Sequence, residues 1–252
     1  MKQRRTFLKN AAALGMAASL MPKTLLASTN KYSNNEGNGY TFLFQGDSIT
    51  DGNRTRNNDW NHIMGHGYVY LVSSRLWYEL PEKKFHFINR GVSGNSVTDL
   101  GNRWQQDTLD IKPDLLSILI GINDVVSFID GNTYNSADNF KARYHALLLQ
   151  TKDAMPQVQL VMIEPFILPV GKVKDKWDIY SEELLKRQAI VKDLAATFNA
   201  IHIPMQDHFN NALQRATADY WIWDGIHPMP AGHELMARTW LKEVDKKLKF
   251  IK

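Results

Sequence analysis

Short apolar runs alternate with longer stretches of helical periodicity from residue 40 onward. The short runs predict five strands: Tyr40–Gln45, Lys84–Asn89, Leu115–Ile120, Gln159–Ile163 and Ala200–Ile203. The longer stretches predict helices: Gly67–Glu79, Thr98–Gln106, Ser136–Ala154, Asp178–Phe198, Met205–Ala216 and Ala231–Lys247. The regular alternation of the two kinds of element is typical of an α/β protein.

The predicted strands are expected to form a parallel sheet. The run LLSILI at 115–120 is apolar at almost every position, as expected for a strand buried on both faces. Strands separated by helices imply right-handed crossovers, which place helices on both sides of the sheet. The chain shows no internal repeat and no second apolar core. We therefore predict one three-layer α/β/α domain over residues 40–252.

The first 39 residues follow a different pattern. A basic segment at 2–9 precedes a largely apolar run, Ala11–Met21. Eleven residues span only about 16 Å as a helix, about half of a bilayer core, so the run is typical of a signal peptide and not of a membrane anchor. Arg4 and Arg5 resemble a twin-arginine export signal. We expect residues 1–27 to direct export to the periplasm or beyond, with 28–39 as a flexible lead-in; the alternative is an N-terminal helix of the domain.

The net charge of +4 is concentrated in this leader. Residues 1–27 contain five basic side chains and no acidic one, so the remainder carries one net negative charge. A nucleic-acid partner is therefore not expected. The absence of cysteine excludes thiolate metal sites, a cysteine nucleophile and a lipid anchor at the cleavage site. The sequence makes no prediction of oligomeric state.

Four small, polar segments stand where a binding site is expected. Three follow predicted strands, GDSIT at 46–50, RGVSGN at 90–95 and GIND at 121–124, and the fourth, DGIHP at 224–228, precedes the last helix. Ligands of parallel sheets bind at the carboxyl ends of the strands. The sequence therefore predicts that these segments meet at one edge of the sheet.

Their residue types are suited to acyl transfer. A serine hydroxyl needs a base within hydrogen-bonding reach, and the base needs a group that orients it. Ser48, His227 and Asp224 are the candidates for nucleophile, base and orienting carboxylate. The developing oxyanion needs donors, which the backbone N–H groups of Ser48 and Gly94 and the side-chain amide of Asn123 could supply. Each motif alone is short enough to occur by chance.

Together, in this order, the four segments resemble the blocks of the SGNH (GDSL-type) esterase/lipase superfamily, over residues 41 to 245. The resemblance implies a flavodoxin-like fold with a five-stranded parallel sheet. It also implies a Ser48–His227–Asp224 triad and an oxyanion hole of Ser48, Gly94 and Asn123. By the same resemblance Asp47 and Asp124 brace loops.

Other chemistries lack their motifs. The chain has no G-x-S-x-G elbow, no P-loop and no G-x-G-x-x-G after a strand. His62 and His66 have the spacing of a metal pair, but no glutamate completes an HExxH motif and the adjacent glycines favour a loop. We expect neither a metal nor an organic cofactor. His233 is interpreted as a surface or capping residue.

The loops point to a sugar substrate. Polar residues fill Asp51–Gly67, and Trp221 and Trp223 directly precede Asp224. With Trp60 they are candidates for sugar binding, although core packing is the alternative for the Trp221 and Trp223 pair. Signal-bearing members of the superfamily include acetylxylan and rhamnogalacturonan acetylesterases, so we expect an acylated, most simply O-acetylated, carbohydrate as partner. A lysophospholipase or thioesterase with the same triad is the alternative. A silent glycan-binding module is disfavoured because it would not need both Ser48 and His227.

Overall fold

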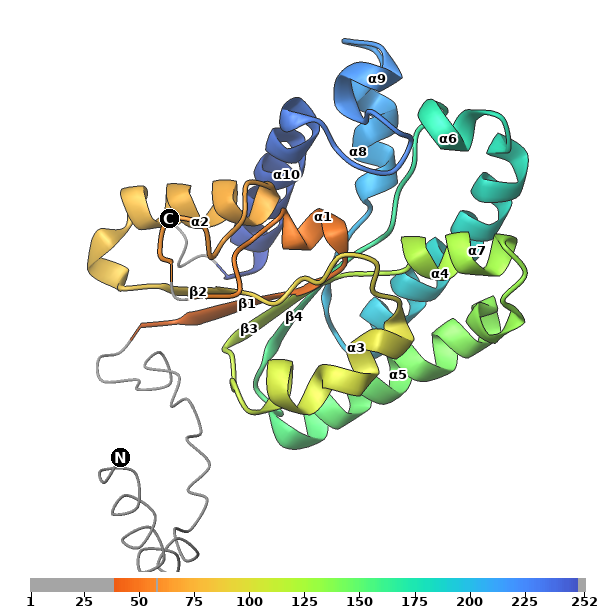
Figure 1. Cartoon of the computed structure of the whole chain (residues 1–252). Coiled ribbons are helices and arrows are strands. Elements are labelled where there is room, and N and C mark those ends of the chain that lie inside the picture. Colours follow the sequence, from red (N-terminus) through yellow and green to blue (C-terminus); the bar gives the residue numbers. More distant parts are fainter. Residues whose placement is uncertain (1–38, 58, 249–252) are drawn as a thin grey trace, which may run out of the picture. The chain divides into compact units, whose positions relative to one another are not determined.

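The computed structural model describes residues 39–57 and 59–248 of the chain (Figure 1). The predicted signal peptide, 1–27, and the lead-in up to residue 38 lie outside the described residues. Within the described part, no helix combines the length and apolar character needed to cross a membrane.

A five-stranded parallel sheet forms the centre of the domain, in the order β2-β1-β3-β4-β5. The strands are listed in chain order as β1 (Thr41–Gly46), β2 (His86–Asn89), β3 (Leu115–Leu119), β4 (Gln159–Ile163) and β5 (Ile201–Ile203). Every pairing between neighbours is parallel. The predicted strands are confirmed, with bounds that differ by at most two residues.

Helices cover both faces of the sheet, so the predicted three-layer fold is confirmed. On one face lie α2 (Tyr68–Glu79), α8 (Met205–Ala212) and α10 (Pro230–Leu248). On the other lie α3 (Val97–Trp104), α5 (Ala137–Ala154) and α7 (Trp177–Thr197). Figure 1 shows α2 and α10 opposite α3 and α5, with the strands between them.

Side-chain alternation along the strands divides the interior into two cores. In β1, Phe42 and Phe44 belong to the core under α2 and α10, whereas Leu43 belongs to the core under α3 and α5. Successive side chains of a strand point to opposite faces, so a strand covered on both sides must be apolar at both. Because the strands are apolar on both faces, helices can pack on both sides of the sheet and form the three layers.

Several short elements were not expected from the sequence. They are α1 (Ser48–Asp51), α4 (Ile122–Ile129), α6 (Gly171–Lys174), α9 (Ala218–Trp221), the 3₁₀ turns Pro81–Lys83 and Thr133–Asn135, and a π-helical turn at Gln105–Leu109. The helices α1, α6 and α9 are single turns, too short to show a helical period. The helix α4 begins directly after β3 and includes the polar pair Asn123 and Asp124, which read as a loop.

Candidate active site

The candidate nucleophile Ser48 is the first residue of α1, directly beyond the carboxyl end of β1. The preceding residue, Asp47, caps this turn because its carboxylate accepts a hydrogen bond from the N–H of Ile49 (3.0 Å). The side chain of Ser48 is half-buried at the same sheet edge as the other polar segments. The turn therefore holds one hydroxyl in a fixed position at the end of a rigid strand.

Ser48, His227 and Asp224 form a continuous chain of hydrogen bonds. The Oγ of Ser48 lies 2.8 Å from Nε2 of His227. On the far side of the imidazole ring, Nδ1 lies 2.8 Å from Oδ2 of Asp224. A carboxylate on Nδ1 leaves Nε2 unprotonated in the neutral ring, so Nε2 can accept the proton of a serine hydroxyl. This is the geometry required for general-base activation of a nucleophile.

Asp224 and His227 lie three residues apart, and a tight turn brings their side chains into contact. Ile222 and Pro228 form an antiparallel bridge, and the N–H of Trp223 donates to the carbonyl of His227 (3.2 Å). At the tip, Oδ1 of Asp224 accepts the N–H groups of His227 (2.7 Å) and Ile226 (2.9 Å). Aspartate favours such turns because its side chain bonds to the backbone two or three residues onward.

The same contacts keep Asp224 ionised. Burial alone would raise its pKa, but the hydrogen bonds from the backbone and imidazole of His227 and from the Ile226 N–H outweigh burial and lower the pKa to about 2. The carboxylate is therefore negatively charged throughout the range in which an imidazole titrates. It can stabilise an imidazolium on the adjacent ring.

Gly94 and Asn123 lie together at this edge. The side-chain amide of Asn123, on α4, donates to the carbonyl of Asn95 (3.0 Å), the residue after Gly94. An amide carries two N–H donors, so one remains for a ligand. Gly94 has a φ of +83° and a Cβ built on it would meet no atom within 4 Å, so its side of the loop is open. The amide of Asn123 therefore lies beside the loop that carries Gly94.

We expect Asn123→Ala to lower kcat about 100-fold with little change in KM, because an oxyanion donor acts mainly in the transition state. Steady-state kinetics on p-nitrophenyl acetate would measure both constants. Asn210→Ala, which truncates an exposed asparagine of α8, serves as the matched control. A kcat within threefold of the parent protein would remove Asn123 from the oxyanion hole.

A buried carboxylate that the sequence analysis did not single out ties the nucleophile turn to the Gly94 loop. Asp51 is 2% exposed, and its Oδ2 accepts both the N–H and the hydroxyl of Ser93 at 3.0 Å. Arg56 donates to both oxygens, at 3.0 and 2.6 Å. Burial would raise the pKa of Asp51, but the hydrogen bonds from Arg56 and Ser93 lower it overall. Asp51 therefore holds Ser93, the neighbour of Gly94, against α1.

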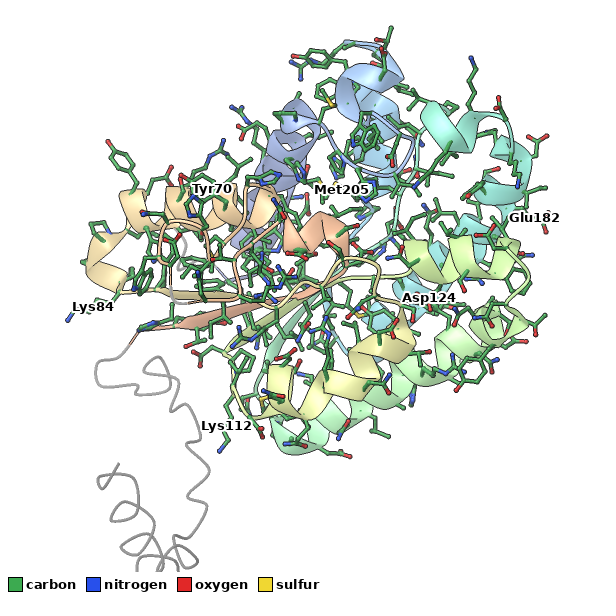
Figure 2. All side chains as sticks on the ribbon, viewed as in Figure 1. Tyr70, Lys84, Lys112, Asp124, Glu182 and Met205 are labelled. Atoms are coloured by element: carbon green, nitrogen blue, oxygen red, sulfur yellow. The ribbon has the colours of Figure 1, made fainter. Side chains whose placement is uncertain are left out.

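Asp47 and Asp124 make the contacts expected of loop braces. Asp47 caps α1, and Asp124 accepts the first N–H of α3, that of Val97, at 3.1 Å. Figure 2 labels Asp124 between α4 and α3. Burial raises the pKa of each carboxyl to about 7. Both carboxylates bond to backbone N–H groups at the start of a helix, and neither is bonded to Ser48, His227 or Asp224.

The three candidate sugar-binding tryptophans occupy different environments. Trp223 is 60% exposed, and its ring lies nearly parallel to that of His227 with centroids 6.2 Å apart. Trp60 is 59% exposed on the loop after α1. Trp221 is only 5% exposed, because it packs in the core. Trp223 is thus placed beside the candidate base.

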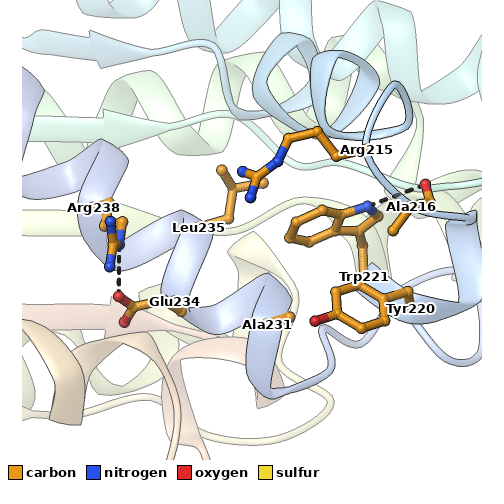
Figure 3. Close-up of a pocket in the computed structure, with 8 residues that line it drawn as sticks. All are labelled: Arg215, Ala216, Tyr220, Trp221, Ala231, Glu234, Leu235 and Arg238. Carbon is orange, nitrogen blue, oxygen red and sulfur yellow. Dashed lines mark hydrogen bonds and ion pairs between the residues drawn. The ribbon is translucent and has the colours of Figure 1, made fainter.

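Trp221, one of the candidates for sugar binding, has its ring buried. Its indole N–H donates to the carbonyl of Ala216 (3.3 Å), and Arg215 lies over the ring at 5.8 Å. Trp221 instead contributes to a separate hollow of about 500 Å³ between α9 and the first turns of α10 (Figure 3). The alternative interpretation, core packing beneath the last loop, describes this residue.

The structure gives the contacts of two histidines that the sequence singled out. His62 bonds through Nδ1 to Asp59 (2.6 Å) in a loop, and the described residues contain no group of three potential ligands around a metal position. His233 is partly buried, and its Nδ1 accepts the N–H of Tyr68 (3.2 Å), so it caps α2 and not its own helix. Burial, with the nearby charges of His66 and His227, lowers the pKa of His233 to about 4.

Comparisons of the sequence and of the structure with known proteins find esterases and lipases of one family. Residues 44–235 match the sequence model of the GDSL-like Lipase/Acylhydrolase family. The chain is 33% identical to an acetylxylan esterase of Geobacillus stearothermophilus, over 82% of this chain and 95% of the relative. A crystal structure of that esterase superposes with a TM-score of 0.72 over 82% of this chain and 95% of that chain. A Parabacteroides merdae protein described as a GDSL-like lipase gives 0.78 at 35% identity, over 82% and 96%.

Proposed function

The chain belongs to the GDSL-like lipase/acylhydrolase family, and from that premise we propose that it removes O-acetyl groups from a carbohydrate through Ser48, His227 and Asp224. Membership of the family makes it a carboxylic ester hydrolase. The observation that carries the proposed mechanism is the unbroken contact from Ser48 Oγ through the His227 ring to Asp224. No cofactor takes part in this mechanism.

The first half of the reaction forms an acetyl-enzyme. Oγ of Ser48 attacks the ester carbonyl carbon while Nε2 of His227 takes the hydroxyl proton, and Asp224 stabilises the resulting imidazolium. The carbonyl oxygen becomes negative and accepts hydrogen bonds from the N–H groups of Ser48 and Gly94 and the amide of Asn123. The C–O bond to the sugar breaks, and His227 returns the proton to the departing sugar oxygen.

The second half regenerates the enzyme. A water molecule takes the position of the departed sugar, and His227 accepts its proton as its oxygen attacks the acetyl carbon. The tetrahedral intermediate collapses to acetic acid as the proton on His227 returns to Oγ of Ser48, and the released acid ionises to acetate in water. Each proton that His227 accepts is returned in the same half-reaction, so the ring ends neutral.

The carbohydrate portion of the proposal is supported by two observations. The relative at 33% identity is an acetylxylan esterase. Trp223 exposes an aromatic ring beside His227, and a sugar ring can pack on such a surface while its hydroxyls bond to neighbouring polar groups. We further propose export through the twin-arginine-like leader, which would bring the enzyme to polymers outside the cytoplasm.

A chain-length series of p-nitrophenyl esters, from acetate to decanoate, tests the acyl group. We expect kcat/KM to be highest for acetate, with release of acetate from acetylated xylo-oligosaccharides, and Ser48→Ala to be silent throughout. A maximum at octanoate or longer would contradict the acetylesterase proposal and favour the lipid or thioester alternative. Full activity on acetate with none on any acetylated glycan would contradict the carbohydrate portion alone.

A further inference from the structure

The short helix α6 packs directly on the backbone of Asp224. The N–H of Lys172 donates to the carbonyl of Asp224 (3.2 Å), and the N–H of Leu168 donates to that of Gly225 (3.0 Å). Gly171 has a φ of +56°, and a Cβ there would lie 2.5 Å from Cα of Asp224. The backbones are thus in contact with no side chain between them. This segment therefore helps to fix the position of Asp224 through contacts between the two backbones.

The contact also brings a positive charge to the triad carboxylate. Nζ of Lys172 lies 3.3 Å from Oδ2 of Asp224, the same oxygen that is 2.8 Å from Nδ1 of His227. The Asp224 side chain is 11% exposed, whereas that of Lys172 is 52% exposed. One buried carboxylate oxygen is therefore shared between an ammonium group at the surface and the imidazole that faces Ser48.

We propose that Lys172 is a positioning residue that competes with His227 for the charge of Asp224 and so keeps the imidazole in its neutral, base-competent form to lower pH. The inference rests on the proposed catalytic function of the triad. The Lys172 ammonium pairs with Oδ2 of Asp224, which would otherwise stabilise only a protonated His227. The positive charge of Lys172 also disfavours a second positive charge on the nearby His227 ring. Protonation of His227 is made less favourable by both effects.

In the described part of the chain, the other titratable groups around His227 carry no positive charge that could take the place of Lys172 beside Asp224. On α10, His233 interacts with the charge of His227, but its own lowered pKa, about 4, keeps it neutral where an imidazole base works. His66, on the loop before α2, interacts with His233. On α1 the contact is the uncharged Ser48. Among the described residues, Lys172 is the cation with an ion pair to Asp224.

The sign of the pH effect follows from the role of His227. Only the neutral ring accepts the proton of Ser48, so kcat/KM falls as the pH drops and the ring becomes protonated. Without Lys172 the ring holds its proton to higher pH, and the acid limb of the profile moves upward. Because the lysine is half-exposed, we expect a shift of about half a pH unit for Lys172→Met. Lys172→Glu should move the limb further, and Lys172→Arg should restore it.

The experiment combines the pH profile of kcat/KM with an NMR titration of the His227 ring, assigned as the signal absent from His227→Gln. Lys174→Met, on the same short helix, is the control because no ion pair to Asp224 involves it. We expect both midpoints to move upward in Lys172→Met and neither in Lys174→Met. Raising sodium chloride to about 1 M, where the Debye length is about 3 Å, should move the parent protein towards the variant.

Unchanged midpoints in Lys172→Met, or an equal shift in Lys174→Met, would overturn the inference. The NMR titration requires no turnover. A shift of the ring signal in a protein without esterase activity would therefore refute the proposed catalytic function and leave the coupling between Lys172 and His227 standing. Esterase activity with unchanged midpoints in Lys172→Met would instead refute the coupling between Lys172 and His227 and leave the proposed catalytic function standing.

Discussion

Ser48→Ala is expected to lower kcat for p-nitrophenyl acetate by about 10⁵- to 10⁶-fold, the loss seen when a triad nucleophile is removed from a serine hydrolase. The Ser48 hydroxyl bonds to His227, so its removal leaves the helix α1 and its Asp47 cap intact. The thermal midpoint of unfolding should therefore change little. Burst and steady-state kinetics, with a differential scanning measurement on the same sample, would check both parts.

The matched control is Ser181→Ala, on α7, where the hydroxyl donates to the carbonyl of Asp178 (3.1 Å). It should retain parental kcat. If Ser48→Ala kept more than about 1% of the parental activity, far above the residual catalysis of a triad lacking its nucleophile, the nucleophile assignment would be wrong.

His227→Ala should cost about as much as Ser48→Ala, because nucleophile and base act as a unit. Asp224→Asn is expected to be milder, at about 10⁴-fold in kcat, since the aspartate orients the ring and stabilises its charge without transferring the proton. The substituted asparagine retains an oxygen that can accept the N–H groups of Ile226 and His227, so the turn is preserved. Kinetics on both variants would establish the order.

His145→Ala, which removes an exposed histidine on α5, controls for loss of a histidine as such. A neutral Asp224→Asn variant would mean that another group orients the imidazole. Equal losses in all three triad variants would also depart from the expected order, and would point to a structural role for Asp224 in holding the turn.

Much of the fold could be predicted because the strands are covered on both faces. The strand β3 is buried on both faces and apolar at every position except Ser117, and that pattern is visible without any tertiary information. The helix α4 could not be predicted in the same way. Its first turn contains Asn123 and Asp124, whose side chains serve the Gly94 loop and α3, so its polar residues reflect contacts with other elements and not exposure.

The candidate site was predictable to the extent that its residues follow strand ends in short motifs. Ser48, Gly94, Asn123, Asp224 and His227 could be named because parallel strands bring their carboxyl ends to one edge. The roles of Asp51 and Lys172 could not, since neither lies within one of the four motifs and each bonds to a residue about 40 to 50 positions away. Neither an isolated aspartate nor an exposed lysine carries a sequence signal.

The different environments of Trp221 and Trp223 could not be predicted from the sequence. Both are tryptophans in the short segment before Asp224, so the sequence does not distinguish the buried ring from the exposed one. Trp221 ends α9 and packs inward, whereas Trp223 follows the extended residue Ile222 and bonds through its backbone to His227. The direction of each ring depends on the bridge between Ile222 and Pro228, which joins two segments of the turn and not two neighbours in sequence.

Covalent labelling with an organophosphonate ester tests the central claim, that Ser48 is a nucleophile activated by His227 and Asp224. Intact-mass and peptide analysis should find a single phosphonyl group on Ser48, formed at a rate that rises as an imidazole loses its proton. Labelling should be absent in Ser48→Ala and slowed by orders of magnitude in His227→Ala. A label on another residue with loss of activity, or an unlabelled and fully active enzyme, would contradict the account.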